Sequence, residues 1–480
     1  KNPPLYGINW YSALEISIRL ITWIFALCFF EDSNEINNNS VFKKIFSSMF
    51  QHAYYLRYFY TKRKFNHTVG ELFGIYLFCR FFNELKPFKK WEKKFYSKFE
   101  SQIFLQTRVD GVNIEQSINY HREVLEYFSL FYFINSRIKI KKKEKILIEK
   151  MYDFLLYIIK PNTSFPLIGD FDDGSILLLN HYIKNPFMQL INFGTILFRR
   201  EDLKFIVNKI YPSSILLTGI EGWKTFHSLK PKEPIKKLKY FKSSGYISIR
   251  NNWNKKANYL FYELARFGPS KASHTHSGIT NFIFSFQGKD IILDSGTFTY
   301  NKSLKERDYF RSSQAHNLLI INQRNQAKTI PWFGWKNIPH IYRKIEKKND
   351  SIRLVCSHDG YKGFITNREL ITNKNLTYLK IIDTIFQKQT EVDKKIYDID
   401  IYYHFNRDLT LKVNENKVII NKILILKISS EQNFIINIEK SFYSPQYGLK
   451  YENSMVKIHF KYSFENKKSL EIITEINPLN

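Results

Sequence analysis

The chain has 480 residues, of which 44% are hydrophobic and 17% aromatic, so it can bury a large core and is long enough for two or three domains. Its three cysteines, Cys28, Cys79 and Cys356, are far apart and form no CxxC motif, which argues against a disulfide framework or a thiolate metal site. The formal net charge of +29 favours a polyanionic partner: nucleic acid, an anionic membrane or an acidic polysaccharide. A chain rich in Lys, Asn and Ile, as an AT-rich genome would encode, would show the same excess of positive charge without a polyanionic partner.

The first apolar segment, residues 12–30, is interrupted by Glu15 and Arg19, so we expect no transmembrane segment there. The i,i+4 spacing of these two charges is typical of an amphipathic helix. The chain starts at Lys1 without a Met and shows no signal peptide, so we expect the natural N-terminus to lie upstream.

Hydrophobic spacing divides the chain into two halves. The first half predicts helices, because apolar residues recur at helical spacing in segments 11–30, 43–62, 66–84, 117–135, 145–160 and 186–209. After a linker at 231–237, short alternating runs predict antiparallel strands at 245–250, 258–265, 281–296, 317–322, 352–360, 376–386 and 417–428. We therefore expect an α+β chain with two domains, 1–232 and 233–480. Helix pairs of similar length fit an (α/α) toroid, and the β half fits a sandwich.

Two polar clusters lie in the predicted helical half. Asn66 and His67 are adjacent at the start of a predicted helix, and Tyr120, His121 and Arg122 lie near the start of another. Taken alone, each cluster is weak, because an ordinary surface pair or a core tyrosine explains it equally well.

A third cluster lies in the predicted strands. His274 and His276 alternate at strand period, and Asp294 follows after a turn at Gly288, so a returning strand would bring it beside His276. His316 adds a further imidazole. Two imidazoles and a carboxylate are good zinc ligands, but the same side chains can also form a buried hydrogen-bonded network.

Together, these segments resemble the heparinase II/III-like family of polysaccharide lyases. The resemblance is carried by NWYSALEISIRLITWIFAL at 9–27, the Asn66-His67 pair, DGVNIEQSINYH at 110–121, FPLIGDFDDG at 165–174, SGYISIR at 244–250, HTHSGITNFIFSFQGKDIILDSGTFTYN at 274–301 and YFRSSQAHN at 309–317. One departure is Gly278, where many relatives have an Asp. A hydrogen bond that orients a histidine is therefore expected to be absent or replaced.

The resemblance implies cleavage of a uronic-acid-containing glycan by β-elimination. Asn66 and His67 would contact the substrate carboxylate and stabilise the charge that develops on it. Tyr120 would transfer the proton, with His274 as its partner base or acid. With syn stereochemistry Tyr120 would serve as both base and acid, whereas with anti stereochemistry the two residues would share the work.

The resemblance also implies a structural metal, expected to be zinc, held by His276, Asp294 and His316. The metal would fix the strand that carries His274. The loop at 169–173 is interpreted as a turn with helix-capping carboxylates and is given no chemistry.

Four further residues are candidates for substrate binding: His121, Arg122, Glu115 and Arg311. A free phenol has a pKa of about 10, so a basic Tyr120 needs positive surroundings, and His121 and Arg122 are expected to supply them. Helix capping or salt bridges remain equally good explanations for Glu115 and Arg311.

The expected partner is an acidic polysaccharide such as alginate, a glycosaminoglycan or a bacterial exopolysaccharide. The alternative is a catalytically silent glycan-binding protein in polysaccharide assembly. Nucleic-acid binding would rest on charge alone, because no recognised motif supports it. A lyase meets its polymer outside the cytoplasm, so a periplasmic or secreted location is expected.

Overall fold

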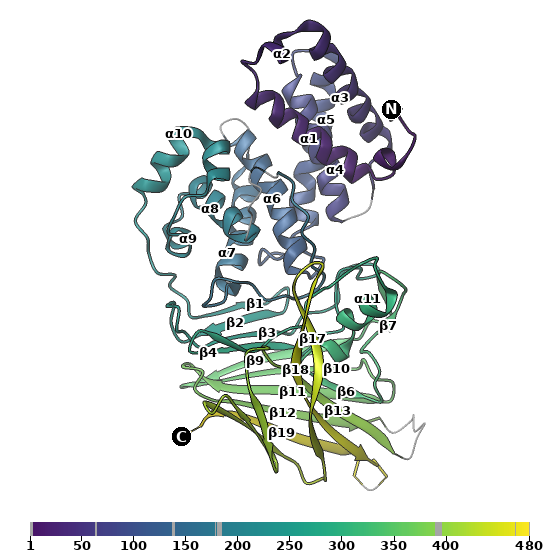
Figure 1. The fold of residues 1–480 in the computed structure, drawn as a ribbon, viewed down its shortest axis with the longest axis vertical. Helices are drawn as coiled ribbons and strands as arrows, with labels where there is room; N and C mark the ends of the chain where they lie inside the picture. The colour runs from purple at the N-terminus through teal and green to yellow at the C-terminus, as the bar shows by residue number, and fades with distance from the viewer. Residues whose placement is uncertain are drawn as a thin grey trace. The chain divides into compact units, whose positions relative to one another are not determined.

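The computed structural model describes residues 3–62, 65–136, 140–177, 179, 185–388, 396–465 and 467–479. In this part of the chain a run of helices is followed by a run of antiparallel strands, as Figure 1 shows. The fold class predicted from the sequence is therefore confirmed.

The chain forms two compact units. The first comprises Lys1–Asn113, Tyr120–Asp153 and Gly174–Pro231, and the second comprises Ile114–Asn119, Phe154–Asp173 and Lys232–Asn480.

The helices of the N-terminal half are mostly three to five turns long. They are η1 (Ile8–Trp10), α1 (Ala13–Phe29), α2 (Asn34–Asn37), α3 (Asn39–Phe59), α4 (Asn66–Phe81), α5 (Lys86–Leu105), α6 (Ile118–Asn135), α7 (Lys142–Ile158), α8 (Pro186–Phe198), α9 (Glu201–Ile206) and α10 (Pro212–Ser228). None of the helices described combines the length and hydropathy that a membrane span requires.

Helices α1 and α4 pack closely against each other. The Ser12 side chain caps α1 by accepting a hydrogen bond from the Glu15 backbone N–H at 3.4 Å. On the buried face, Ser17 Oγ donates to the Gly70 carbonyl oxygen at 2.7 Å. A Cβ on Gly74 would collide with Ser17, so the close approach of the two helices depends on this glycine.

The second unit contains the strands and one further helix. The strands are β1 (Leu238–Phe241), β2 (Tyr246–Arg250), β3 (Tyr259–Glu263), β4 (Phe282–Phe286), β5 (Lys289–Ile292), β6 (Leu319–Ile321), β7 (Lys328–Thr329), β8 (Trp335–Lys336), β9 (Ile341–Lys348), β10 (Ser351–His358), β11 (Phe364–Asn373), β12 (Leu379–Gln387), β13 (Tyr397–His404), β14 (Leu411–Asn414), β15 (Lys417–Ile420), β16 (Leu424–Ser429), β17 (Ile435–Gln446), β18 (Leu449–Tyr462) and β19 (Ser469–Pro478). Helix α11 (Leu304–Arg311) and the short η2 (Ser313–Ala315) lie between β5 and β6.

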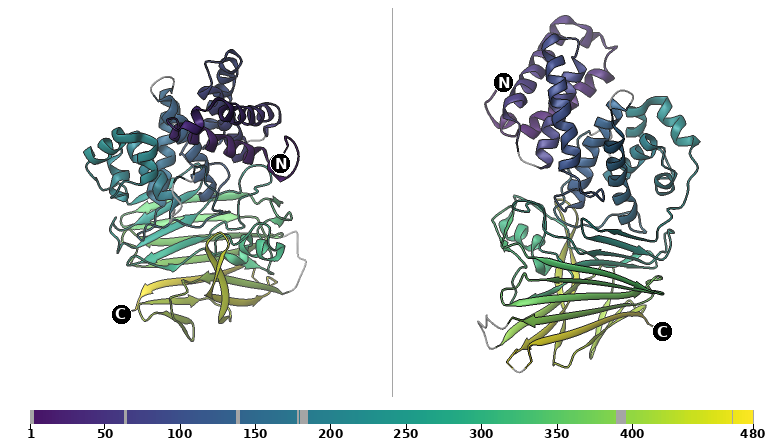
Figure 2. Two further views of the ribbon diagram at one scale, coloured as in Figure 1. Left: turned by 45° about the horizontal axis from the view of Figure 1, so that its top comes forward. Right: turned by 180° about the vertical axis from the view of Figure 1, so that it is seen from behind.

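The strands form antiparallel sheets, which Figure 2 shows from two further sides. The largest sheet has the order β14-β15-β16-β19-β12-β11-β10-β9, beside a five-stranded sheet β1-β2-β3-β4-β5, a four-stranded sheet β17-β18-β13-β6 and the small β7-β8 pair. Alternation is clear in β12, where every second residue from Leu379 to Gln387 is buried. The inward-facing residues of all three larger sheets share one apolar cluster, as expected of packed sheets.

Two short segments from upstream of the linker belong to this second unit. Their backbone carbonyls accept hydrogen bonds from buried tyrosines of the five-stranded sheet. Tyr259 Oη donates to Ile158 at 2.6 Å, and Tyr246 Oη donates to Gln116 at 3.3 Å. Segments 114–119 and 154–173 are thereby fixed on the unit that carries His274, Thr275 and His276. These three consecutive residues are called the HTH motif, after their one-letter codes.

Candidate functional site

The centre of the site is a buried carboxylate that the sequence did not single out. Asp170 lies in the loop after α7, and its Oδ2 is 3.1 Å from His274 Nδ1 while its Oδ1 is 3.0 Å from His276 Nε2. Asp170 and His276 are almost fully buried, and the side chain of His274 is 13% exposed. The two histidines of the HTH motif therefore share a single carboxylate.

Arg307 of α11 holds this carboxylate. Its guanidinium contacts both oxygens of Asp170, with Nη2 at 2.7 Å from Oδ2, and its Nε donates to the Trp332 carbonyl at 2.9 Å. The rings of Tyr300 and Phe333 lie against the same guanidinium, each centroid 5.1 Å from Cζ. Burial opposes ionisation of Asp170, but Arg307 and the two imidazoles hold its pKa well below the usual range. Asp170 is thus a carboxylate.

His274 lies between two acidic side chains. Its Nδ1 faces Asp170, and its Nε2 is 3.6 Å from Glu115 Oε2. Burial alone would lower the pKa of His274, but the hydrogen bond to Asp170 and the charge of Glu115 raise it above the usual value. Glu115, one of the four candidates for substrate binding, therefore lies directly beside His274.

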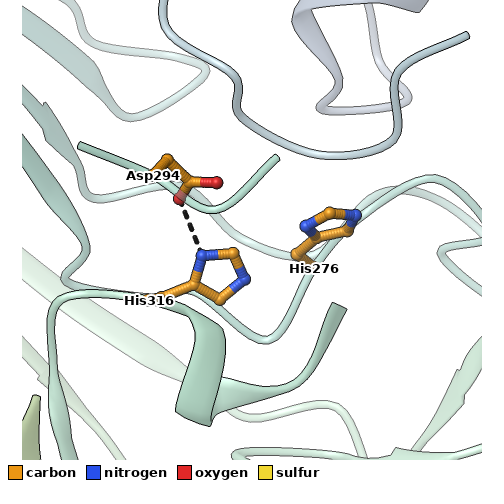
Figure 3. Close-up of side chains that lie close together, drawn as sticks. All are labelled: His276, Asp294 and His316. Atoms are coloured by element: carbon orange, nitrogen blue, oxygen red, sulfur yellow. Dashed lines mark hydrogen bonds and ion pairs between the residues drawn. The ribbon is translucent and has the colours of Figure 1, made fainter. Parts of the chain in front are cut away.

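The predicted metal ligands lie close together. Figure 3 shows the side chains of His276, Asp294 and His316 close together. One possible ligand atom from each residue lies within 4.8 Å of the other two. His316 Nδ1 is 2.7 Å from Asp294 Oδ2, and all three residues are buried. The sequence was right to group these three residues, and the group could hold a metal ion.

The donor atoms also fit a metal. His276 Nδ1 and His316 Nε2 are buried, and neither has a hydrogen-bond partner among the residues that the structure describes. A buried polar atom without a partner is costly, and a cation would satisfy two such nitrogens at once. Imidazole and carboxylate donors suit zinc.

A second carboxyl, that of Glu263 at the end of β3, lies near this group. A Cβ on Gly278 would be 3.3 Å from Glu263 Oε2 and 3.5 Å from the His316 ring. Burial and the charge of Asp294 raise the pKa of Glu263 well above the usual range. Gly278 therefore has the Glu263 carboxyl next to it.

Two predicted catalytic residues begin helix α4 in the first unit. Asn66 is buried, whereas the side chain of His67 is 53% exposed. His67 Nδ1 lies 4.0 Å from Glu71 Oε1, one turn further along the helix. Their adjacent positions at a helix start agree with the sequence pattern, and their roles remain predictions.

Tyr120, His121 and Arg122 lie in the first turns of α6, and all three are buried. His121 Nδ1 accepts from the Asn113 backbone N–H at 3.2 Å, and its Nε2 faces the Met151 carbonyl at 3.0 Å. Burial lowers the pKa of His121 to about 3, so the ring is neutral at neutral pH. The expectation that His121 makes the surroundings of Tyr120 positive is therefore not supported.

The two arginines proposed for substrate binding are held by protein groups. Arg122 contacts Glu126 Oε2 at 3.3 Å and the Gly174 carbonyl at 2.6 Å. Arg311 is fully buried and pairs with Asp308, its Nε lying 2.9 Å from Oδ1. For Arg311, the salt-bridge explanation that the sequence left open is the one the structure shows.

No chemistry was expected of Asp170 from the sequence, and Arg307 was not among the candidate residues. The segment FPLIGDFDDG had been noticed, and an acidic residue between the apolar residues of this segment was a possible signal. The hydrogen bonds of Asp170 span 104 residues to His274 and 137 residues to Arg307, so local patterns could not reveal them.

Family comparison agrees with this fold. A model of the heparinase II/III N-terminus matches residues 3–190, and a model of the heparinase II/III-like C-terminal domain matches residues 233–471. The chain belongs to the heparinase II/III-like family and carries both of its domains.

Two curated relatives are heparin-sulfate lyases. The protein from Bacteroides stercoris is 21% identical over 429 residues, which cover 86% of this chain and 57% of that protein. The protein from Pedobacter heparinus is 21% identical over 255 residues, which cover 52% of this chain and 34% of that protein. The chain thus matches about half or less of the length of these relatives.

Solved structures share the fold. A crystal structure of heparinase III superposes with a TM-score of 0.80 at 17% identity and covers all of this chain and 71% of that one. A heparan sulfate lyase from Pedobacter heparinus gives 0.72 at 18% identity, covering 99% and 70%. A chondroitin AC lyase from Streptomyces coelicolor gives 0.60 at 8% identity, covering 99% and 68%.

Proposed function

We propose that this protein is a polysaccharide lyase that cleaves a uronic-acid-containing acidic glycan by β-elimination. The observation that carries the proposal is His274, whose two ring nitrogens face Asp170 and Glu115 in a member of a lyase family. The heparin-sulfate lyases among its relatives support an acidic glycan as the substrate class. The net charge of +29 would attract such a polymer.

The reaction removes the proton at C5 of the uronate and expels the oxygen at C4. In our proposal Tyr120 carries the proton transfer, and His274 is its partner as base or acid. Asn66 and His67 bind the substrate carboxylate, and their N–H groups stabilise the negative charge that develops when C5 loses its proton. A soluble polymer of this kind is met outside the cytoplasm, so we propose a periplasmic or secreted location.

We further propose that His276, Asp294 and His316 hold a structural zinc ion. When bound, the ion would supply positive charge to two buried imidazoles and a buried carboxylate, and so stabilise the segment that carries His274. We expect about one equivalent of metal in the purified protein by elemental analysis, and a loss of it in His316→Ala. A fully folded protein that takes up no zinc would contradict this site.

The decisive variant is Tyr120→Phe, which removes only the phenol oxygen. β-Elimination creates an unsaturated uronate that absorbs in the near ultraviolet, so activity can be followed on a panel of acidic glycans. We expect the variant to lose at least about 100-fold in kcat, because a positioned proton-transfer group typically contributes 10²–10⁴-fold. Tyr132→Phe on the same helix is the matched control and should retain activity.

The same panel separates the lyase from the alternative, a catalytically silent glycan-binding protein. The lyase predicts absorbing products from at least one uronate polymer. Tight binding of a polymer by the wild type, with no absorbing product from any member of the panel, would overturn the lyase and support the binding protein.

A further inference from the structure

We propose that Asp170 is a positioning residue that fixes the N–H tautomer of both histidines of the HTH motif and so couples the metal centre to His274. This inference rests on the proposed function for the role of His274. The coupling itself is a property of the protein without substrate, so it can be tested separately.

Asp170 determines where the hydrogens lie on its two histidine partners. Its carboxylate accepts hydrogen bonds from both terminal nitrogens of Arg307, which can only donate. A carboxylate held in this way can only accept hydrogen bonds, and the two remaining partners are His274 Nδ1 and His276 Nε2. Both of these ring nitrogens must therefore carry the hydrogen.

The hydrogen bond to Asp170 fixes the tautomer of His276. A neutral imidazole carries one hydrogen, so a hydrogen at Nε2 leaves a lone pair at Nδ1. This is the buried nitrogen that lacks a hydrogen-bond partner among the described residues, and it belongs to the proposed metal group. Asp170 thus assigns Nδ1 as the ligand atom of His276, in the carboxylate–histidine–metal arrangement common at metal sites.

The hydrogen bond to Asp170 also fixes the orientation of the His274 ring. With its hydrogen at Nδ1 held by Asp170, the ring presents Nε2 on the opposite side, 3.6 Å from Glu115 Oε2. Nε2 is then the atom that exchanges a proton with the substrate. A ring turned over by 180° would lose the bond to Asp170, so the carboxylate also sets the orientation.

Backbone contacts make the coupling stiff. The Asp170 N–H donates to the His274 carbonyl at 2.9 Å, and Ser117 Oγ donates to the Asp170 carbonyl at 2.6 Å. Gly169 has a φ of +70°, and a Cβ there would be 2.7 Å from the His274 carbonyl oxygen. The loop and the HTH segment therefore cannot shift independently, and an imidazole displaced by loss of the metal would displace Asp170 with it.

The experiment uses the variant Asp170→Asn and makes two measurements. Its zinc affinity is measured by competition with a chromophoric chelator, and the visible spectrum is recorded for the cobalt-loaded protein. We expect zinc to bind about 10–100-fold more weakly than in the wild type, the usual effect of removing such a partner. The cobalt spectrum should change, because His276 is no longer held in one orientation. Asp173→Asn, an exposed carboxylate of the same loop, is the control and should bind like the wild type.

Asp170→Asn leaves Arg307 buried without its anion and could fail to fold. The double variant D170N/R307M removes this unpaired charge, and it should fold and show the same weakened zinc binding. Wild-type zinc affinity and an unchanged cobalt spectrum in whichever of these variants folds would overturn the coupling. A wild-type protein that binds no zinc would overturn it as well.

Activity gives an independent readout if the lyase is confirmed. Asp170→Asn measured at saturating zinc should lower kcat with little change in KM, because the metal is restored but the orientation of His274 is not. A normal kcat at saturating zinc would contradict the role at His274. Weakened zinc binding in a protein with no lyase activity would leave the coupling intact and refute only the proposed function.

Discussion

At the scale of single residues, buried charge pairs stand out from the many surface pairs. Arg368 of β11 and Asp383 of β12 form a two-pronged ion pair, with both N–O distances at 2.7 Å, and both residues are buried. Arg368 also donates to the Asn317 carbonyl at 2.5 Å, so it links the large sheet to the segment after His316. Such a pair is costly to break because one charge would remain buried.

We expect Asp383→Ala to lower the free energy of unfolding by about 3–5 kcal/mol, since Arg368 would lose its counter-charge inside the protein. The measurement is urea denaturation followed by circular dichroism. The control is Glu369→Ala, which breaks the partly exposed pair with Arg353 on the same sheet and should cost at most about 1 kcal/mol. Equal losses in the two variants would contradict this ranking.

Residue-level prediction succeeded where the partners were close in sequence. His276 precedes and Asp294 follows the hairpin of β4 and β5, so this hairpin is enough to bring them together. The sequence could not show that His121 is neutral or that Arg311 is paired, because the chemistry of a histidine or an arginine depends on burial, which residue type does not reveal. Burial makes His121 neutral, and Asp308 pairs with Arg311.

At the scale of secondary-structure elements, hydrophobic periodicity predicted most of the longer helices, but it missed α5 and α10 and the strands β11, β13, β17, β18 and β19. The segment 11–30 forms α1 and 66–84 forms α4, because an apolar stripe at helical spacing has no better way to be buried. The order of strands in the sheets could not be predicted. β19 pairs with both β12 and β16, contacts that short-range patterns do not encode.

The packing of α1 on α4 provides a test at this scale. Gly74→Leu should lower the free energy of unfolding by about 1–3 kcal/mol, because the added side chain must displace Ser17 in a closely packed interface. Thermal denaturation of the variant checks it. Thr22→Leu adds bulk to an exposed position of α1 and should change stability by no more than about 0.5 kcal/mol, and a similar loss there would remove the packing explanation.

At the scale of the whole molecule, several buried histidines are kept neutral. Burial lowers the pKa of His121 to about 3 and of both His358 and His404 to about 4. As the pH falls below about 6.5, the unfolded chain takes up protons that the folded protein does not bind. The free energy of unfolding should therefore fall between pH 6.5 and pH 4.

This pH dependence can be assigned to individual histidines. Urea midpoints measured from pH 7 to pH 4 should decrease, with a contribution on the order of 1 kcal/mol per buried histidine and pH unit. His358→Gln should flatten the slope, because its side chain does not titrate. His340→Gln, at a side chain that is 95% exposed, should leave the slope unchanged. A slope that is the same in the wild type and in His358→Gln would show that other groups control acid unfolding.

The non-contiguous build of the second unit constrains how this protein can be cut or recombined. His274 comes from downstream of the linker, but Asp170 and Glu115 come from upstream of it. A fragment that starts at residue 232 would retain every strand and all three proposed zinc ligands, and would still lack both acidic neighbours of His274. A chimera of two family members joined at the linker would combine the His274 imidazole of one protein with the Asp170 loop of the other. Crossover points intended to preserve function should therefore lie away from the linker.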